Sequence, residues 1–267
     1  MTLLLEAKVY IVGAGPGDPE LITVKGQNIL KQADVILYTD SLVNEQLMEV
    51  AKPEAEILKS AGMNLEELVD CMVTNVEQGK SVARVHTGDP AVYGAILEQM
   101  RYLKRAEVDY EIIPGVSSVF AAAAAAGIEL TVPELTQTVI LTRAEGRTPM
   151  PEREQLKDLA SHHCSTALFL SATLIKKVVR EFLEAGWLET DPVVVVYRAS
   201  WPDQKVVRTT LGQLDETMRA EGIRKQAMVI ISKAADERLL TEEGKYESKL
   251  YDKTFTHGFR KGEQVNG

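Results

Sequence analysis

Short runs rich in valine and isoleucine recur along this 267-residue sequence and alternate with stretches whose apolar residues are three or four positions apart. The short runs are typical of buried β-strands, and the longer spacing is typical of helices that bury one face. Strands and helices that alternate in this way form a sheet covered by helices. The sequence therefore predicts an α/β fold.

The first half of the sequence supplies five of the predicted strands and two of the helices. The strands are expected at residues 8–12, 35–38, 56–59, 81–86 and 109–113. The helices are expected at residues 64–78 and 92–105, because each carries apolar residues on one stripe, as Leu68, Met72 and Val76 do in the first. Each stripe needs a sheet beneath it.

A second series of strands and helices follows in the other half. Its strands are expected at residues 139–142, 167–171, 193–197, 206–210 and 228–232, and its helices at residues 152–161 and 174–185. Pro133 disfavours a helical Val132 and suits a linker between the two series. We therefore expect an N-terminal α/β domain at residues 1–133, a second α/β domain at residues 134–240 and a C-terminal extension at residues 241–267.

The composition argues against several classes of protein. A formal net charge of −9 opposes non-specific binding to nucleic acid, whose phosphates select basic surfaces. The longest apolar stretch, residues 119–128, is shorter than the roughly 20 residues that a membrane span needs. Cys71 and Cys164 form neither a disulfide framework nor, with the histidines, a metal-ligand spacing. With no secretory signal evident either, we expect a cytoplasmic protein that binds no metal, nucleic acid or membrane.

The segment VGAGPGDPELIT at residues 12–23 is a glycine-rich turn between a predicted strand and a predicted helix. Its glycines are spaced GxGxG, whereas the dinucleotide fingerprint GxGxxG requires glycine at the position of Asp18. Asp18 followed by Pro19 is typical of a helix N-cap, and a carboxylate there would repel a pyrophosphate. The segment therefore argues against NAD or FAD and leaves two interpretations: a tight turn, or a backbone that approaches another ligand.

Two further turns have a similar composition. HTGDPAVYGA at residues 86–95 and IIPGVSSVFAAAAAAG at residues 112–127 each follow a predicted strand and precede a predicted helix. Asp89 can accept hydrogen bonds from a ligand or can simply cap its helix, and Ser117 or Ser118 can cap the other helix. Ligands of open α/β folds bind at the carboxyl edge of the sheet, where all three turns are expected. The turns together therefore predict one shared ligand site.

These three segments, in this order, resemble the tetrapyrrole methylase family, and the resemblance spans nearly the whole chain. Four longer strings are similar to the branch of that family that methylates C11 of precorrin-4 or cobalt-precorrin-4. They are TQTVILTRAEGRTPMPE at residues 136–152, LFLSAT at 168–173, YRASWPDQ at 197–204 and SKLYDKTFTHGFRK at 248–261. Uroporphyrinogen methylases usually carry a His-Arg pair where this chain has Thr131, Val132 and Pro133, which argues against that branch.

The resemblance implies two α/β domains of the tetrapyrrole methylase type, unlike a Rossmann methyltransferase, with S-adenosylmethionine in the cleft between them. It also implies a homodimer. The positions that match the family's cofactor contacts are Pro16, Thr87, Gly88, Asp89, Val92, Ser117, Ser118, Leu170 and Ala199. The family often has methionine at the position of Leu170 and glycine at that of Ala199, so backbone contacts are expected there more than side-chain contacts.

The chemistry that the resemblance implies is displacement at the sulfonium methyl by a nucleophilic carbon of the macrocycle. Positioning should dominate, since preorganised geometry can remove roughly 7 to 11 kcal/mol of a barrier and the thioether leaves as a neutral molecule. A proton must later leave the substrate. Asp40 and His86 are the candidates for a catalytic or binding role, with a helix cap and a structural histidine as the competing explanations.

A precorrin carries several carboxylates, for which guanidinium groups are natural bidentate partners. The arginines in or beside the matching motifs are Arg84, Arg143, Arg147, Arg153 and Arg198. We expect them to bind substrate carboxylates, Arg143 and Arg147 above all, because these two lie in a branch-specific segment. The alternative for each is a solvated surface residue. Cobalt, where the substrate contains it, would arrive with the macrocycle and not on the protein.

Other functions stay open on the sequence alone. One is methylation of another precorrin carbon, at the precorrin-2 or precorrin-3 stage. Another, of a different class, is a non-catalytic carrier or regulator that binds S-adenosylmethionine or a tetrapyrrole. The tail at residues 248–261 could cover the cleft, reach a partner subunit or pack as a simple extension, and its resemblance to versions from the cobalt-early route favours a cobalt-containing substrate.

Overall fold

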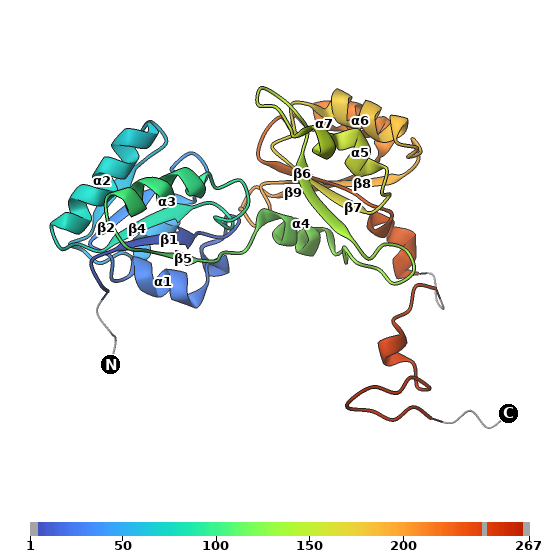
Figure 1. The fold of residues 1–267 in the computed structure, drawn as a ribbon. Helices are drawn as coiled ribbons and strands as arrows, with labels where there is room; N and C mark the ends of the chain where they lie inside the picture. Colours follow the sequence, from blue (N-terminus) through green and yellow to red (C-terminus); the bar gives the residue numbers. More distant parts are fainter. Residues whose placement is uncertain (1–4, 242–244, 264–267) are drawn as a thin grey trace. The chain divides into compact units, whose positions relative to one another are not determined.

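A computed structural model describes residues 5–241 and 245–263 of the chain. The chain divides into two compact units. The first comprises Met1–Ala122 together with Arg198–Gln204, and the second comprises Ala123–Tyr197 together with Lys205–Gly267. Each unit contains one five-stranded sheet with helices packed against it (Figure 1).

The first sheet is parallel throughout and has the strand order β3-β2-β4-β1-β5. Its strands are β1 (Val9–Gly13), β2 (Val35–Tyr38), β3 (Glu56–Lys59), β4 (Val82–His86) and β5 (Tyr110–Ile113). The three central strands are buried along their whole length, which explains why their sequences are nearly continuous apolar runs. All five predicted strands of the first half are confirmed to within one residue.

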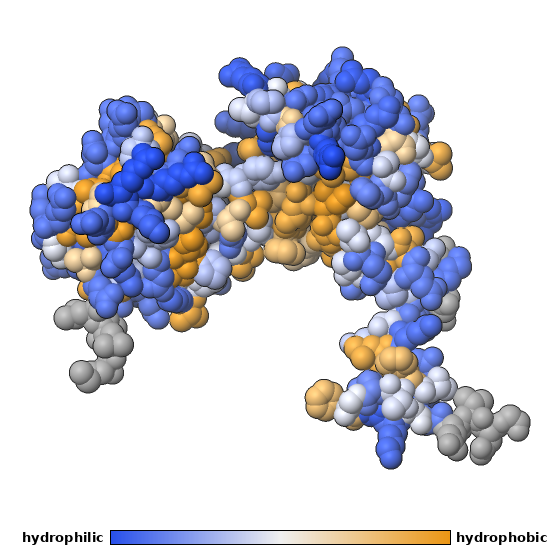
Figure 2. Space-filling view, viewed as in Figure 1, coloured by the Kyte–Doolittle hydropathy of each residue, from blue (hydrophilic) through white to orange (hydrophobic). Residues whose placement is uncertain are grey.

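Helices cover both faces of this sheet. The helical segments of this part of the chain are η1 (Pro19–Leu21), α1 (Val24–Leu30), η2 (Glu45–Val50), α2 (Leu65–Glu77), α3 (Ile96–Arg105) and α4 (Ser118–Ala126). The last, α4, crosses the boundary between the units. Leu68 and Met72 of α2 and Leu103 of α3 pack on one face, and Ile29 and Leu30 of α1 pack on the other. The outward side of α3 is strongly hydrophilic (Figure 2).

Two predicted helices are shorter than the sequence indicated. The helix expected at residues 92–105 begins only at Ile96, because Tyr93 and Ala95 adopt left-handed backbone conformations with φ of 57° and 50°. The helix expected at residues 152–161 is interrupted by Gln155, whose ψ of 140° is extended. It divides into a 3-10 turn η3 (Glu152–Glu154) and a short helix α5 (Leu156–Ala160).

The second sheet is mixed and has the strand order β6-β7-β10-β8-β9. Its strands are β6 (Val139–Arg143), β7 (Ser165–Phe169), β8 (Pro192–Tyr197), β9 (Lys205–Thr210) and β10 (Ala227–Ile231). Strands β6 and β7 are parallel, whereas β10 runs antiparallel to both of its neighbours and β9 runs antiparallel to β8. The strands predicted for the second half are present, with ends that move by up to two residues.

One face of the second sheet carries the core of that unit. The helical segments are α5, α6 (Ile175–Glu184), η4 (Leu211–Gln213), α7 (Leu214–Ala220), η5 (Lys233–Ala235), η6 (Glu237–Leu240) and η7 (Lys249–Tyr251). Val178 and Phe182 of α6 and Met218 of α7 are buried against Val195 and Val229 of the sheet. In the described part of the chain, no helix combines the length and the apolar character required to cross a membrane.

Candidate functional site

The three glycine-containing turns lie together at one edge of the first sheet. They follow β1, β4 and β5, which are adjacent and parallel, so their carboxyl ends meet at the same edge. Gly15 and Gly88 pair as an isolated bridge, with N–H to O distances of 3.2 and 2.7 Å in the two directions. The second and third turns are joined through Asp89, whose Oδ2 accepts a hydrogen bond from the Gly115 N–H at 2.9 Å.

The turns approach so closely that side chains are excluded between them. A Cβ placed on Gly13 would lie 2.6 Å from the Cα of Gly115 and 2.7 Å from the carbonyl oxygen of Gly88. Such distances are well inside van der Waals contact, so only glycine fits at Gly13. At this edge the three turns therefore pack backbone against backbone.

Asp89 uses both carboxylate oxygens within the protein. While Oδ2 binds the third turn, Oδ1 accepts a hydrogen bond from the Ala91 N–H at 2.8 Å and so orders the start of its own loop. Because residues 92–95 are not helical, this is a loop cap and not the cap of α3. Asp89 therefore fixes the spacing of two of the turns.

The other predicted cofactor residues differ in exposure. Thr87 is exposed, Val92 and Ser118 are half-buried, and Gly88 and Ser117 are buried. Asp18 caps η1 with Pro19 in its first turn, and this part of the sequence interpretation is confirmed.

The two remaining cofactor candidates come from the segments after β7 and β8. Leu170 belongs to the second unit, has a φ of 52° and exposes 70% of its surface. Ala199 is buried within Arg198–Gln204, which belongs to the first unit.

Arg84 is buried in the middle of the first unit and does not face solvent. Its guanidinium donates to the carbonyl oxygen of Leu37 at 3.2 Å, to Ser60 Oγ at 3.0 Å and to Thr39 Oγ1 at 3.2 Å, and its Nε donates to Gln99 Oε1 at 3.3 Å. Burial lowers the pKa of Arg84 to about 10. This placement ties the ends of β2 and β3 to α3 and favours a structural role over the predicted binding of carboxylates.

His86 is also buried, two residues further along the same face of β4. Its burial and the neighbouring Arg84 guanidinium lower its pKa to about 3. Its Nε2 is buried without a hydrogen-bond partner among the described residues. The imidazole is therefore neutral at physiological pH, and so low a pKa makes it a weak base.

Asp40 lies on the exposed loop after β2, near the same edge of the sheet. Its Oδ1 accepts a hydrogen bond from the N–H of Ala61, which follows β3, at 2.9 Å. The carboxylate thus links two neighbouring strand ends and is not the helix cap that the sequence offered as an alternative.

Three of the predicted arginines lie in or near the loop that follows β6 in the second unit. Arg143 donates to the carbonyl oxygens of Thr148 at 3.2 Å and Pro149 at 2.9 Å, so it folds the loop back on itself. Arg147 is exposed on that loop, and Arg153 is exposed in η3. The loop therefore presents Arg147 to solvent while Arg143 shapes it.

The fifth predicted arginine, Arg198, contacts two side chains of the first unit. Its guanidinium stacks on Trp201, 4.1 Å from the ring centroid, and forms an ion pair with Asp203 at 2.8 Å. Trp201 in turn donates a hydrogen bond from Nε1 to the carbonyl oxygen of Pro16. In the sequence, Trp201 stands within YRASWPDQ, and nothing in that string indicates its contact with a turn 185 residues away.

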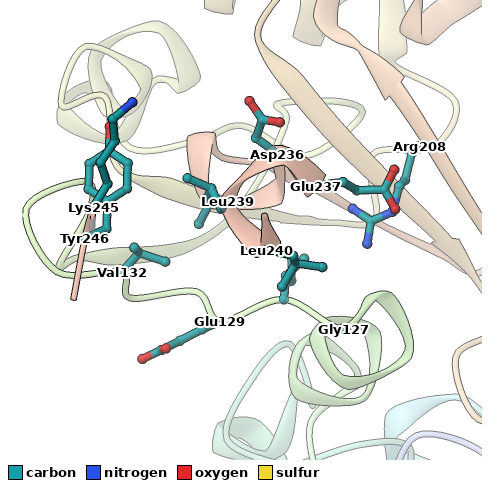
Figure 3. A pocket seen from close by; sticks show the side chains of 12 residues that line it. Gly127, Glu129, Val132, Arg208, Asp236, Glu237, Leu239, Leu240, Lys245 and Tyr246 are labelled. Atoms are coloured by element: carbon teal, nitrogen blue, oxygen red, sulfur yellow. The ribbon is translucent and has the colours of Figure 1, made fainter. Parts of the chain in front are cut away.

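A cavity of about 190 Å³ lies in the second unit (Figure 3). Arg208 on its wall forms an ion pair with Glu237 at 2.9 Å and donates to the carbonyl oxygen of Ala235 at 3.0 Å. None of the predicted site residues lines this cavity. Among the residues that the structure describes, no group of three or more His, Cys, Asp or Glu side chains is arranged to hold a metal ion.

Comparison with known proteins supplies the family. Residues 8–215 match the family model of the tetrapyrrole (corrin/porphyrin) methylases. A curated cobalt-precorrin-4 C(11)-methyltransferase of Priestia megaterium is 66% identical over 255 residues, which are 96% of this chain and 98% of that protein.

Two solved structures of methyltransferases are similar to this chain. The X-ray structure of a cobalt precorrin-4 methyltransferase of cobalamin biosynthesis superposes with a TM-score of 0.85 at 66% identity, covering 86% of this chain and 96% of that one. A uroporphyrin-III C-methyltransferase of Thermus thermophilus, solved in complex with S-adenosyl homocysteine, has a TM-score of 0.71 at 28% identity, covering 91% and 99%. The chain belongs to the tetrapyrrole methylase family.

Proposed function

We propose that this chain is an S-adenosylmethionine-dependent methyltransferase that methylates C11 of cobalt-precorrin-4 in cobalamin biosynthesis. The observation that carries the proposal is the 66% identity, over nearly the full length of both chains, to a curated enzyme with that activity. The geometry supports it, because the three turns whose sequences resemble the family's cofactor motifs meet at one sheet edge.

The edge formed by the three turns fits S-adenosylmethionine. The close approach of Gly13, Gly88 and Gly115 brings the three turns together as one compact edge. Such an edge suits a ligand with adenine, ribose and amino-acid groups, which need many small hydrogen-bonding partners. When bound, the cofactor supplies a methyl group activated by a sulfonium.

The protein's part in the reaction is to bind and orient. We assign the contacts with S-adenosylmethionine, the methyl donor, to the sheet edge formed by the three turns and to the two segments after β7 and β8. The residues are Pro16, Thr87, Gly88, Asp89, Val92, Ser117, Ser118, Leu170 and Ala199. Asp89 keeps the second and third turns in register through its two hydrogen bonds. Because orientation can remove roughly 7 to 11 kcal/mol of a barrier, this rigidity matters more than any acid or base.

We assign the substrate's carboxylates to the loop after β6. Arg147 is the residue we expect to contact them, since it is exposed on a loop that Arg143 holds in shape. Arg153 is exposed close by in the sequence and is a further candidate. Of the two proposed catalytic residues, Asp40 suits proton handling better than His86, because its carboxylate is exposed whereas the imidazole is buried and of low pKa.

The test is methyl transfer from S-adenosylmethionine to cobalt-precorrin-4, precorrin-4, precorrin-3 and precorrin-2, compared under identical conditions. Fastest turnover of cobalt-precorrin-4 is the expected result. Preferred turnover of precorrin-2 or precorrin-3 would establish a methylase of another carbon. Tight binding of S-adenosylhomocysteine without turnover of any of the four would identify a binding protein instead.

We further propose that the protein is a cytoplasmic homodimer, with domains divided near residues 133 and 134 and a tail from residue 241. The edge strands of the second sheet expose Leu141 on β6 and Val206 on β9, each to 38%, which supports association through this unit. Light scattering on the purified protein tests the dimer: the mass of a single chain would contradict it.

A further inference from the structure

The first glycine-rich turn is held by side chains that lie far away in the sequence. The carbonyl oxygen of Pro16 accepts a hydrogen bond from Trp201 Nε1 at 3.0 Å. Two residues later, the N–H of Asp18 donates to Ser200 Oγ at 3.0 Å. Both hydrogen bonds are partly buried, so water competes less for their donors and acceptors. The turn is therefore fixed on both sides by Arg198–Gln204 of the same unit.

Gly17, at the middle of the turn, lies directly beneath the indole. A Cβ on Gly17 would overlap the Cδ1 and Nε1 atoms of Trp201 and would lie 2.8 Å from its Cε2. The carbonyl oxygen of Gly17 accepts a further hydrogen bond from Asn44 Nδ2 at 2.9 Å. The contact with Trp201 explains the third glycine of the GxGxG pattern, which a nucleotide fingerprint did not explain.

The indole is also held by a second side chain. The Arg198 guanidinium stacks on it at 4.1 Å from the ring centroid and is fixed by the ion pair with Asp203. The segment also contains two left-handed residues, with φ of 46° at Arg198 and 70° at Ser200. Left-handed conformations of non-glycine residues are costly and persist where surrounding contacts impose them. The segment's own bonds, such as Ser200 N–H to Gln204 Oε1 at 2.7 Å, and its contacts with the first turn together hold this shape.

We infer that Trp201 is a positioning residue for binding of the methyl donor: it holds the backbone at Pro16 and Gly17 in the conformation that the donor meets. The inference rests on the proposed function, which places Pro16 among the donor's contacts. Trp201 does not touch the reacting atoms in this account. It acts by preorganising a turn that would otherwise have to be ordered at a cost in affinity.

The test is calorimetric binding of S-adenosylhomocysteine to wild-type protein and to Trp201→Phe. Phenylalanine keeps an aromatic ring at this position but has no N–H to donate to Pro16. We expect affinity to fall about tenfold, which corresponds to about 1.4 kcal/mol. The Michaelis constant for S-adenosylmethionine should rise by a similar factor while kcat changes little, since the reacting atoms are untouched.

Trp187→Phe is the matched control. Trp187 is the other of the two tryptophans, and its Nε1 donates to the carbonyl oxygen of Ala160 at 2.8 Å in the core of the second unit. The substitution removes the same kind of hydrogen bond, so it should lower the melting temperature and leave the affinity within twofold of wild type. In this variant Trp201 is the one remaining tryptophan, and its fluorescence emission should change when S-adenosylhomocysteine binds.

Three results would overturn the inference. Trp201→Phe that binds within twofold of wild type would show that Trp201 only stabilises the fold. Where that variant does not fold, Gly17→Ala decides the matter, because a Cβ on Gly17 overlaps the indole of Trp201 and must displace it, and unchanged affinity would again contradict the inference. Wild-type protein that binds no S-adenosylhomocysteine would refute the cofactor assignment first, and the role of Trp201 with it.

Discussion

The carboxylate of Asp89 accepts a hydrogen bond from the backbone N–H of Gly115 at 2.9 Å and thereby joins two turns that are 26 residues apart in the sequence. The same carboxylate caps its own loop through the Ala91 N–H. One side chain therefore sets the distance between the second and third turns. The cofactor site that we propose depends on this distance.

Replacing Asp89 with alanine should weaken binding of S-adenosylhomocysteine by more than tenfold. It should also lower the free energy of unfolding by about 1–3 kcal/mol, since hydrogen bonds to a charged acceptor are lost at a half-buried site. Calorimetry and urea unfolding measure the two effects. Asp70→Ala, at an exposed position of α2, removes the same group and should change neither quantity. Equal effects of the two substitutions would argue against the bridging role.

Gly13→Ala should damage both the fold and the site. The added methyl would lie 2.6 Å from the Cα of Gly115, so the turns must move apart, at a cost of about 1–3 kcal/mol. Affinity for S-adenosylhomocysteine should fall with it. At Gly62 an added Cβ meets nothing within 4 Å, and Gly62→Ala should stay within about 0.5 kcal/mol of wild type. A melting temperature of Gly13→Ala equal to that of Gly62→Ala would refute the close approach.

The buried His86 should make the protein sensitive to acid. Its pKa is lowered from 6.5 to about 3 in the folded protein, by burial and then by Arg84. Below pH 6.5 the imidazole of His86 is protonated in the unfolded chain but stays neutral in the folded protein. The free energy of unfolding therefore falls as pH is lowered from about 6.5 towards about 3, by up to about 1.4 kcal/mol per pH unit. His86→Asn should flatten this part of the stability profile. Urea unfolding across this range provides the check, and an unchanged slope would contradict the assignment.

Replacing Arg84 with glutamine should affect stability, whereas the same replacement of Arg147 should affect substrate binding. Arg84→Gln removes a buried guanidinium that binds the ends of β2 and β3, and it should lower the melting temperature by several degrees. Arg147→Gln should leave the melting temperature unchanged and raise the Michaelis constant for cobalt-precorrin-4 about tenfold, through loss of a charge-assisted pair. Steady-state kinetics and thermal unfolding of both variants separate the two roles. A raised Michaelis constant for Arg84→Gln alone would reverse our assignment.

The sequence predicted the strands well because buried parallel strands are nearly continuous apolar runs. Val35–Tyr38, which is buried along its whole length, has the same bounds in the sequence interpretation and in the structure, and so does the largely exposed edge strand Glu56–Lys59. The start of α3 was not predicted, since helical spacing continues through residues 92–95, whereas Tyr93 and Ala95 adopt left-handed conformations that end the helix there. Local pattern identifies the elements, and packing decides where they begin.

The candidate site was predictable in place but not in detail. Three turns of similar composition after neighbouring strands indicated a common edge, and the strand order brings them there. The sequence could not show that the side chain of Arg84 is buried, because the same strand pattern fits an arginine that binds a ligand and an arginine that packs inside the protein. Nor could it show that Trp201 covers Gly17, since 184 residues separate them.

The central claim is tested most directly by locating the methyl group in the product. Cobalt-precorrin-4 is incubated with the protein and S-adenosylmethionine whose methyl carbon is isotopically labelled, and the product is analysed by NMR. The account predicts a single labelled methyl attached to C11, with one S-adenosylhomocysteine formed for each methyl transferred. A label at any other carbon, or an unlabelled macrocycle recovered after binding of the donor has been demonstrated, would contradict it.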